Sequence, residues 1–436
     1  MRPDGGPQTG GVGTRSAREP WLFAVFAAFV LGFYLLPSTR ELGSAPHDLL
    51  FYLLTLPIWV ALAGGRMWRA VRRGDSGSQL LVLALVFILY LGLSALWTTG
   101  DAELSPMTVV IYTAATAVFL IASSEVLDRD GWRRLQGLVV GAAVAIAGVS
   151  LAAFVFGDHS YLGRLNSVIH FEHPNLFAHY TGFAALICLL RILEVRRTGK
   201  GRARPWMGAG GVLVTALVLT QGRTTMVAFV AAAGLAIVIA RDRRAAAALA
   251  MLLMVVAFGY LLAGGDWGPS LIKRGEAGRL FIYQSLLEKM DGRWWTGVGL
   301  AAADEVEFPV GSDDFPRGFT MPHSHSAFVA TFYHGGALGL VLLLAAVGMT
   351  GCLAWRVARE RGDPTGATLL LFGVVCLLAD GHRLVSNPHL SSWLIFWLPV
   401  GWVIAAGRWQ AAEVTRPEAA GGASEVRGRT PPTALF

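Results

Sequence analysis

The chain has 436 residues, of which 54% are hydrophobic and only 15% are charged. Soluble domains carry charge on about a quarter of their residues, so this composition indicates an integral membrane protein. The net charge of +7 does not indicate a nucleic-acid partner, because the basic residues follow a membrane topology. The three cysteines, Cys188, Cys352 and Cys376, fall within apolar runs, so structural disulfides and zinc sites are not expected.

Along the chain, apolar runs recur with the length that a helix needs to cross a bilayer. We therefore predict an all-α fold, a polytopic inner-membrane helical bundle of about 12 transmembrane helices with a large periplasmic loop that contains helices. The predicted spans are 21–37, 48–65, 79–97, 106–124, 137–156, 175–193, 206–221, 223–240, 245–263, 326–348, 365–384 and 389–407.

The loops between these spans predict the orientation. With the N-terminus in the cytoplasm, about 26 of the 36 lysines and arginines lie on the cytoplasmic side, which is the positive-inside pattern. The N-terminal segment lacks the short apolar core of a signal peptide, so both termini are expected in the cytoplasm. The predicted parts are a cytoplasmic segment, transmembrane helices 1–9, the periplasmic loop, transmembrane helices 10–12 and a disordered tail, at 1–20, 21–263, 264–325, 326–407 and 408–436.

The predicted outer side carries most of the residues that are suited to chemistry. In the loop 264–325, Tyr283, Leu286, Leu287 and Met290 follow helical spacing, so 280–290 is expected to form an amphipathic helix in the membrane interface. The sequence has no Walker-type phosphate loop, and ATP does not enter the periplasm. A reaction on this side must therefore use a substrate that is already activated.

Four arginines on the outer side are candidates for binding phosphate. Arg223 stands between two apolar runs with almost no loop, and an ionisable group in such a place usually faces a cavity and a partner. Alternatively, the side chain of Arg223 extends along the helix so that its charge reaches the lipid headgroups and serves no catalytic role. Arg279 offers the planar, permanently charged fork that suits phosphate oxygens, unless it is simply solvated in its loop. Arg164 and Arg274 are further candidates for substrate binding.

Two histidines stand in Pro322-His323-Ser324-His325-Ser326, directly before an apolar run. Imidazole is the side chain best able to accept a proton near neutral pH, so His325 is a candidate general base and His323 a candidate for substrate binding. If Arg223 and Arg279 lie near His325, their charges favour the neutral ring that a base requires. A metal site remains an alternative, because acidic residues occur in the same loop, although no third ligand at a suitable spacing is evident.

These motifs resemble the O-antigen ligase family, which is related to O-antigen polymerases and bacterial O-oligosaccharyltransferases. The family pattern has a histidine, then Asn, Ser or Gln, nine residues, a glycine, two residues and a small residue. His325-Ser326 and Gly336-Ala337-Leu338-Gly339 are similar to that pattern. Many members have Asn after the histidine, where this chain has Ser326, and this departure slightly favours a ligase over a polymerase.

Three other stretches carry the resemblance, which covers roughly residues 20–405. Gln221-Gly222-Arg223 is similar to the start of a family helix. Arg279, followed later by Gly297-Val298-Gly299, resembles the stretch that opens the family's periplasmic loop. The stretch from Arg164 to Asn175 resembles its Arg…His-Pro-Asn segment.

The resemblance implies an inverting, metal-independent glycosyltransferase that uses no cofactor. Its donor would be O-antigen linked to undecaprenyl pyrophosphate, and its acceptor a sugar hydroxyl of lipid A-core, at the periplasmic face of a bacterial inner membrane. His325 would act as the base, and Arg223 and Arg279 would bind the pyrophosphate. Membrane lipids are the other expected partners, and nucleic acid is not.

Two alternatives remain open from the sequence. An O-antigen or exopolysaccharide polymerase would use the same donor with a second lipid-linked glycan as acceptor. A lipid-linked oligosaccharide flippase or transporter belongs to another class. A transporter of that kind is expected to show internal repeats and charges at mid-membrane, whereas here the spans are apolar and the charges gather at one face.

Overall fold

In the computed structural model, the described residues are 20–36, 45–61, 74–157, 160–161, 163–169, 174–262, 278–308 and 319–414. The predicted N-terminal segment, Arg274 and most of the predicted tail lie outside these ranges. The predicted periplasmic loop is described only over 278–308 and 319–325.

The regular secondary structure of the described residues is helical apart from two short hairpins. The helices, with their π-helical and 3-10 turns (η), are α1 (Pro20–Leu35), α2 (Ala45–Leu49), η1 (Leu50–Thr55), α4 (Ser76–Leu93), η2 (Ser94–Trp97), α5 (Pro106–Val126), α6 (Arg129–Phe156), α7 (Pro174–Thr198), α8 (Arg204–Thr220), α9 (Arg223–Ala240), α10 (Arg243–Leu262), α12 (Arg279–Lys289), α13 (Ala327–Arg361), α14 (Thr365–Ala379), α15 (Leu390–Ser392), η3 (Trp393–Trp397) and α16 (Leu398–Val414). Antiparallel pairs join β1 (Ser160–Tyr161) to β2 (Arg164–Leu165), and β3 (Val306–Glu307) to β4 (Thr320–Met321).

Six of the described helices are long and apolar enough to cross a membrane: α4 with η2, α5, α6, α7, α9 and α13. Shorter apolar helices occupy Pro20–Leu35, Pro46–Ala61, Thr365–Ala379 and Trp393–Trp409. The expected multi-pass helical membrane protein is thus confirmed. Every predicted span overlaps a described helix, but crossing of the membrane by all twelve stays a prediction.

Several helix boundaries differ from those predicted by hydropathy. Helix α6 begins at Arg129, not near residue 137, because the Asp128 carboxylate accepts a hydrogen bond from the Gly131 amide at 2.7 Å and caps the helix. Helix α13 runs to Arg361, beyond the predicted end at 348, and stops where Gly362 takes φ +62°. Hydropathy finds only the apolar part of a helix and misses polar turns that continue it.

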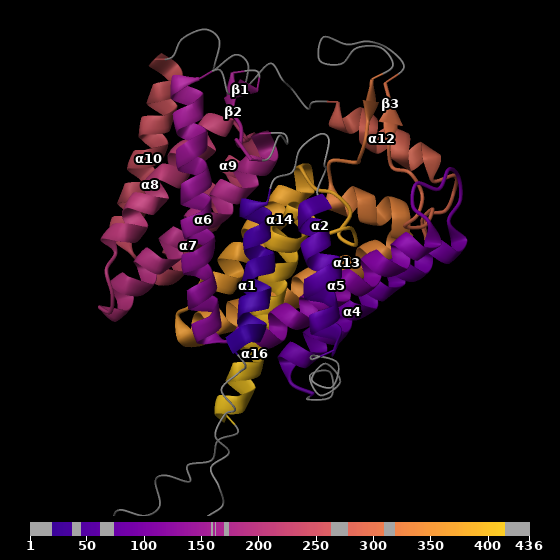
Figure 1. The fold of residues 1–436 in the computed structure, drawn as a ribbon, viewed down its shortest axis with the longest axis horizontal. Coiled ribbons are helices and arrows are strands. Elements are labelled where there is room, and N and C mark those ends of the chain that lie inside the picture. Colours follow the sequence, from indigo (N-terminus) through magenta and orange to yellow (C-terminus); the bar gives the residue numbers. More distant parts are fainter. Residues whose placement is uncertain are drawn as a thin grey trace, which may run out of the picture.

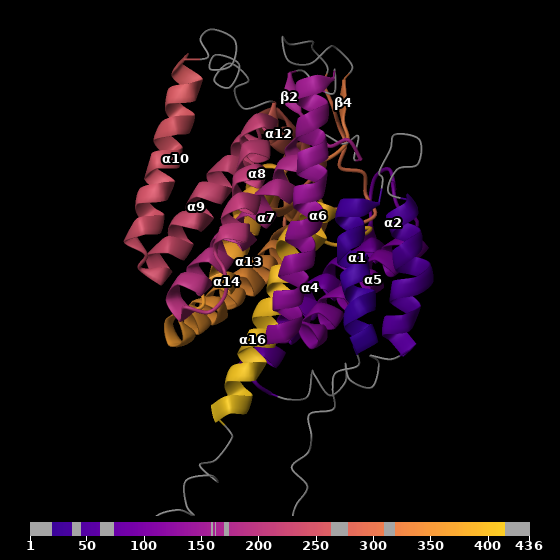
Figure 2. The same ribbon diagram turned by 60° about the vertical axis from the view of Figure 1, so that its left-hand side comes forward.

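The helices pack around one large apolar core. Helix α13 lies against α4 and α14, α14 lies against α9, and α7 lies against α8; Figure 2 shows α7, α8, α9 and α10 gathered on one side of the bundle and α1, α2 and α5 on the other. Large aromatic side chains fill the interior, among them Phe29, Phe372, Trp393 and Trp397. Their burial fixes the helices whose ends carry the candidate site.

At one end of the bundle, α12 and the β3–β4 hairpin form a small layer over the helices (Figure 1). This layer has its own apolar cluster, in which Ile282 and Leu286 of α12, and Met290 directly after it, pack with Val298 and Tyr333. The prediction of which side of α12 is buried was wrong in part, because Ile282, outside the predicted face, is fully buried, whereas Leu287, within it, is 36% exposed. The helix lies on the protein core, and the spacing i, i+4, i+8 marks its buried side.

Helix α13 is kinked at Gly336, which adopts φ +62° and ψ −164°, a conformation that L-residues avoid. The amides of Ala337 and Leu338 donate to the carbonyls of Trp294 and Trp295 at 2.7 and 3.2 Å. The carbonyl of His334 in turn accepts from the Gly299 amide at 2.9 Å. The kink therefore fastens the segment 294–299 to the helix through backbone hydrogen bonds, which explains a glycine at this place in the motif.

Candidate active site

His325 lies at the end of the predicted outer loop, directly before α13. Its φ of +55° is uncommon for a residue with a side chain. The next residue, Ser326, is the N-cap of α13 and accepts from the Val329 amide at 3.3 Å. A small polar side chain after the histidine thus starts the helix, and it fixes the backbone from which the imidazole extends.

The imidazole of His325 lies between a carboxylate and a thioether. Its Nδ1 is 3.4 Å from Oδ1 of Asp380, and its Nε2 is 2.9 Å from Sδ of Met321. Asp380 follows the last residue of α14, and the carbonyl of His325 accepts from the next amide, Gly381, at 3.3 Å. If Nδ1–H donates to the carboxylate, Nε2 keeps a lone pair that can accept a proton, since a thioether is only a weak partner.

The positive charge of Arg279 also acts on the carboxylate of Asp380. Burial alone would raise the pKa of Asp380, but the hydrogen bond from His325 and the nearby Arg279 outweigh burial and hold that pKa well below its usual range. The guanidinium of Arg279 has no hydrogen-bond partner among the described residues. Tyr283, one turn further along α12, contacts Ser326. The structure therefore brings Arg279 and His325 together around Asp380.

Arg223 and Arg164 lie at the neighbouring turn between α8 and α9. Arg223 is the first residue of α9, and Gly222 before it lies so close to Ala178 of α7 that a Cβ would clash at 2.7 Å. Arg164 is buried beneath this turn, where its Nε donates to the Thr220 carbonyl at 2.8 Å and its guanidinium also donates to the Asn175 amide oxygen at 2.7 Å. These hydrogen bonds of Arg164 stabilise the turn. Direct contact of Arg164 or Arg223 with a substrate stays a prediction.

His323 and His382 extend a row of imidazoles away from His325. The ring of His323 lies 4.2 Å from that of His325 and 5.3 Å from that of His382, centre to centre. Burial, and then the neighbouring His325, lower the pKa of His323 to about 4. Burial and His389 likewise lower the pKa of His382. Among the described residues, no group of three or more His, Cys, Asp or Glu side chains is placed to hold a metal ion.

The pKa of His323 leads to a prediction about stability. Between its folded pKa of about 4 and the ordinary value of 6.5, the unfolded chain binds more protons than the folded chain, so stability rises with pH in this window. The full contribution, up to about 3 kcal/mol, is present above pH 6.5 and is lost as the pH falls toward 4. Thermal unfolding of His323→Gln in detergent should therefore depend less on pH over this range than that of the wild type. Equal pH dependence of the two proteins would assign the effect to other groups.

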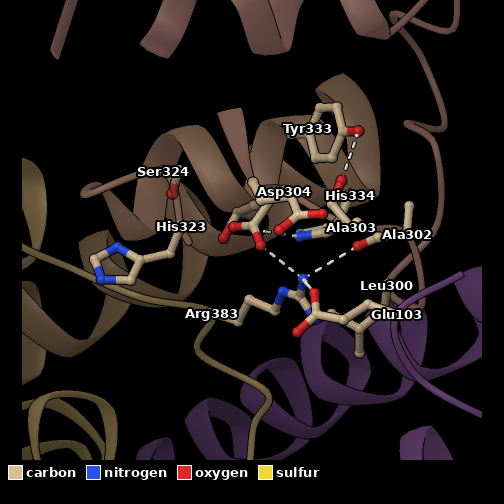
Figure 3. Close-up of polar contacts among 12 residues, drawn as sticks. Glu103, Leu300, Ala302, Ala303, Asp304, His323, Ser324, Tyr333, His334 and Arg383 are labelled. Carbon is tan, nitrogen blue, oxygen red and sulfur yellow. Dashed lines mark hydrogen bonds and ion pairs between the residues drawn. The ribbon is translucent and has the colours of Figure 1, made fainter. Parts of the chain in front are cut away.

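A second polar cluster, centred on Arg383, lies beside the candidate site (Figure 3). Its guanidinium is 2.6 Å from Asp304 and 2.5 Å from Glu103, and it also donates to the Ala302 carbonyl at 3.1 Å. Burial alone would raise the pKa of Asp304, but His334 and Arg383 outweigh it and hold that pKa well below its usual range. The cluster joins the outer loop to the α4–α5 connection and to the segment after α14.

Backbone contacts strengthen this attachment of the loop. Tyr333 of α13 donates to the Ala303 carbonyl at 3.0 Å, and the Thr99 amide donates to the Val298 carbonyl at 2.9 Å. Figure 3 shows Tyr333 and His334 on one side of Asp304, with Arg383 and Glu103 on the other. Sequence spacing pairs neither Asp380 with His325 nor Asp304 and Glu103 with Arg383, because these partners are distant along the chain.

Comparison with known proteins bears on the identity of this chain. A family model described as O-antigen ligase matches residues 208–344, a range that includes Arg223, Arg279 and His325. A protein of Pseudomonas aeruginosa named O-antigen ligase is 23% identical over 366 residues, which cover 82% of this chain and 84% of that protein. Both matches name the family that the motifs indicated, and they confirm the resemblance of this chain to the O-antigen ligases.

Proposed function

We propose that this chain transfers O-antigen glycan from undecaprenyl pyrophosphate to a sugar hydroxyl of lipid A-core, at the periplasmic face of a bacterial inner membrane. The similarity to O-antigen ligases supports a glycan-transferring ligase in general terms. The pairing of His325 with Asp380, beside the charge of Arg279, supports the chemistry most directly.

In the proposed reaction, Asp380 orients the His325 ring through Nδ1, and Nε2 takes the proton of the acceptor hydroxyl. The hydroxyl oxygen forms a bond to the anomeric carbon as the bond from that carbon to the pyrophosphate oxygen breaks. The electron pair leaves on the pyrophosphate, and attack from the opposite face inverts the anomeric centre. Arg279, together with Arg223 from the α8–α9 turn, stabilises the negative charge of the leaving group.

A transfer assay with the purified protein in liposomes tests this function. One sample contains the undecaprenyl-pyrophosphate-linked glycan and lipid A-core, and a second lacks lipid A-core. Glycan joined to lipid A-core in the first sample alone is the expected result. Lengthened lipid-linked glycan in both samples, with the core unmodified, would indicate a polymerase, and no new bond in either would favour a transporter.

Arg279→Lys should lower the transfer rate by about ten- to a hundredfold, because an ammonium group cannot replace the paired hydrogen bonds of a guanidinium to phosphate oxygens. Arg293→Lys is the matched control, since Arg293 is an exposed arginine of the same loop. Initial rates in the liposome assay compare the two variants. Equal rates for both would show that Arg279 does not hold the leaving group.

A further inference from the structure

A cavity of about 160 Å³ lies at the opposite end of the bundle from the candidate active site. Helix α13 relates the two places, because His325 precedes its first turn and Arg361 ends its last turn, with the 35 residues of the helix between them. The cavity is enclosed by the first turns of α6, the ends of α7 and α13, and the last part of α16. Its volume is about ten times what one buried water needs.

Arginines surround this cavity, and its acidic residues are already engaged. The lining arginines are Arg129, Arg133, Arg197 and Arg361, against which stand only Glu194 and Asp363. Glu194 accepts from Arg133 at 2.6 Å and also pairs with Arg191. Asp363 accepts from the Thr365 amide at 3.0 Å. Four arginines against two carboxylates leave an excess of two positive charges around the cavity, which favours an anion there.

Buried donors without acceptors line the same cavity. Gln136 is 3% exposed and lies in its wall. The indole nitrogens of Trp132 and Trp402 are buried, and neither has an acceptor within the described part of the chain. A buried polar group normally has a hydrogen-bond partner, so the two indoles indicate a bound group that supplies acceptor atoms, and the amide of Gln136 can donate to the same group.

We propose that this cavity binds the headgroup of an anionic phospholipid. It lies at the end of membrane helices, where arginines gather, which by the positive-inside pattern is the cytoplasmic surface with its anionic lipids. The phosphate oxygens accept from the arginines and from the buried donors. Tryptophans at the membrane surface suit the region between headgroup and acyl chain, and Trp132 and Trp402 lie in the wall of the cavity.

Native mass spectrometry of the purified full chain tests this binding. The protein in neutral detergent is incubated with equal amounts of phosphatidylglycerol and phosphatidylcholine, and the retained lipids are counted. The wild type should retain phosphatidylglycerol preferentially. In Arg129→Gln/Arg361→Gln this preference should fall by about tenfold or more, because two of the lining charges are lost. Gln136→Leu keeps every charge and should lower it by about fivefold through the lost hydrogen bonds.

The matched control is Arg134→Gln/Arg359→Gln, which removes the same charge from the same two helices at residues that do not line the cavity. It should retain phosphatidylglycerol as the wild type does. Equal losses in the two double variants, or no preference in the wild type, would overturn the proposal. Displacement of the lipid by inorganic phosphate alone would also overturn it, and would assign the cavity to a free anion. None of these outcomes depends on glycan transfer.

Discussion

Replacing His325 with glutamine is expected to lower the rate of glycan transfer by about 10²- to 10⁴-fold, the usual contribution of a general base. Glutamine is similar in length, but it cannot accept a proton at neutral pH. The measurement is the initial rate of transfer to lipid A-core in liposomes. Donor binding and thermal unfolding should remain close to those of the wild type, because His325 is partly exposed and, within the described ranges, its ring lies against Asp380, Met321 and His323.

Asp380→Asn provides the companion test. The variant keeps the size of the side chain and removes the charge that orients the His325 ring at 3.4 Å. If the two residues act as a unit, the double variant should be no slower than His325→Gln alone. Losses that multiply in the double variant would contradict the pairing, and full activity of His325→Gln would remove the base from the mechanism.

The second large effect is expected from Gly336→Ala. Any side chain at this position is strained, because the conformation at φ +62° and ψ −164° is essentially restricted to glycine and costs about 1–3 kcal/mol for other residues. The added Cβ would also collide with the backbone of Trp295. The kink and the docked segment 294–299 must then separate, so the unfolding temperature should fall and transfer should be largely lost.

Gly348→Ala serves as the matched control for this substitution. Gly348 lies in the same helix with ordinary helical backbone, and a Cβ there meets nothing within 4 Å. Its unfolding temperature should be unchanged or slightly raised, since alanine favours helix over glycine. Thermal unfolding and limited proteolysis within residues 294–299 would compare the two variants. Similar behaviour of both would show that the kink is dispensable.

Local patterns in the sequence predicted the helices well. Hydropathy located the apolar runs, and the polar residues at their ends, such as Asp128, extend them by capping that a hydropathy average does not detect. The buried face of α12 was predicted only in part. Tyr283, Leu286, Leu287 and Met290 form one apolar stripe with helical spacing, but Ile282, Leu286 and Met290 form an adjacent stripe that is equally apolar. The choice depends on the partner surface, here Val298 and Tyr333.

The polar partners of the site could not be predicted in this way. The sequence motif singled out His325, but its carboxylate, Asp380, lies 55 residues further on, after another helix. Arg383 pairs with Asp304 and Glu103 across 79 and 280 residues. Nothing in the composition of a single chain indicates which acid meets which base over such distances, because packing of the helices decides it.

These long separations also bear on the order in which the protein is made. Asp380 and Arg383 are synthesised after α13, so the outer loop and its histidine enter the membrane protein before the residues that hold them. Until α14 and the segment that follows it have been inserted, Asp304 and Glu103 lack their shared cation and His325 lacks its carboxylate. A nascent chain thus carries its candidate phosphate-binding arginines before its candidate base is oriented, so the candidate site stays unassembled until α14 and the segment after it have been inserted.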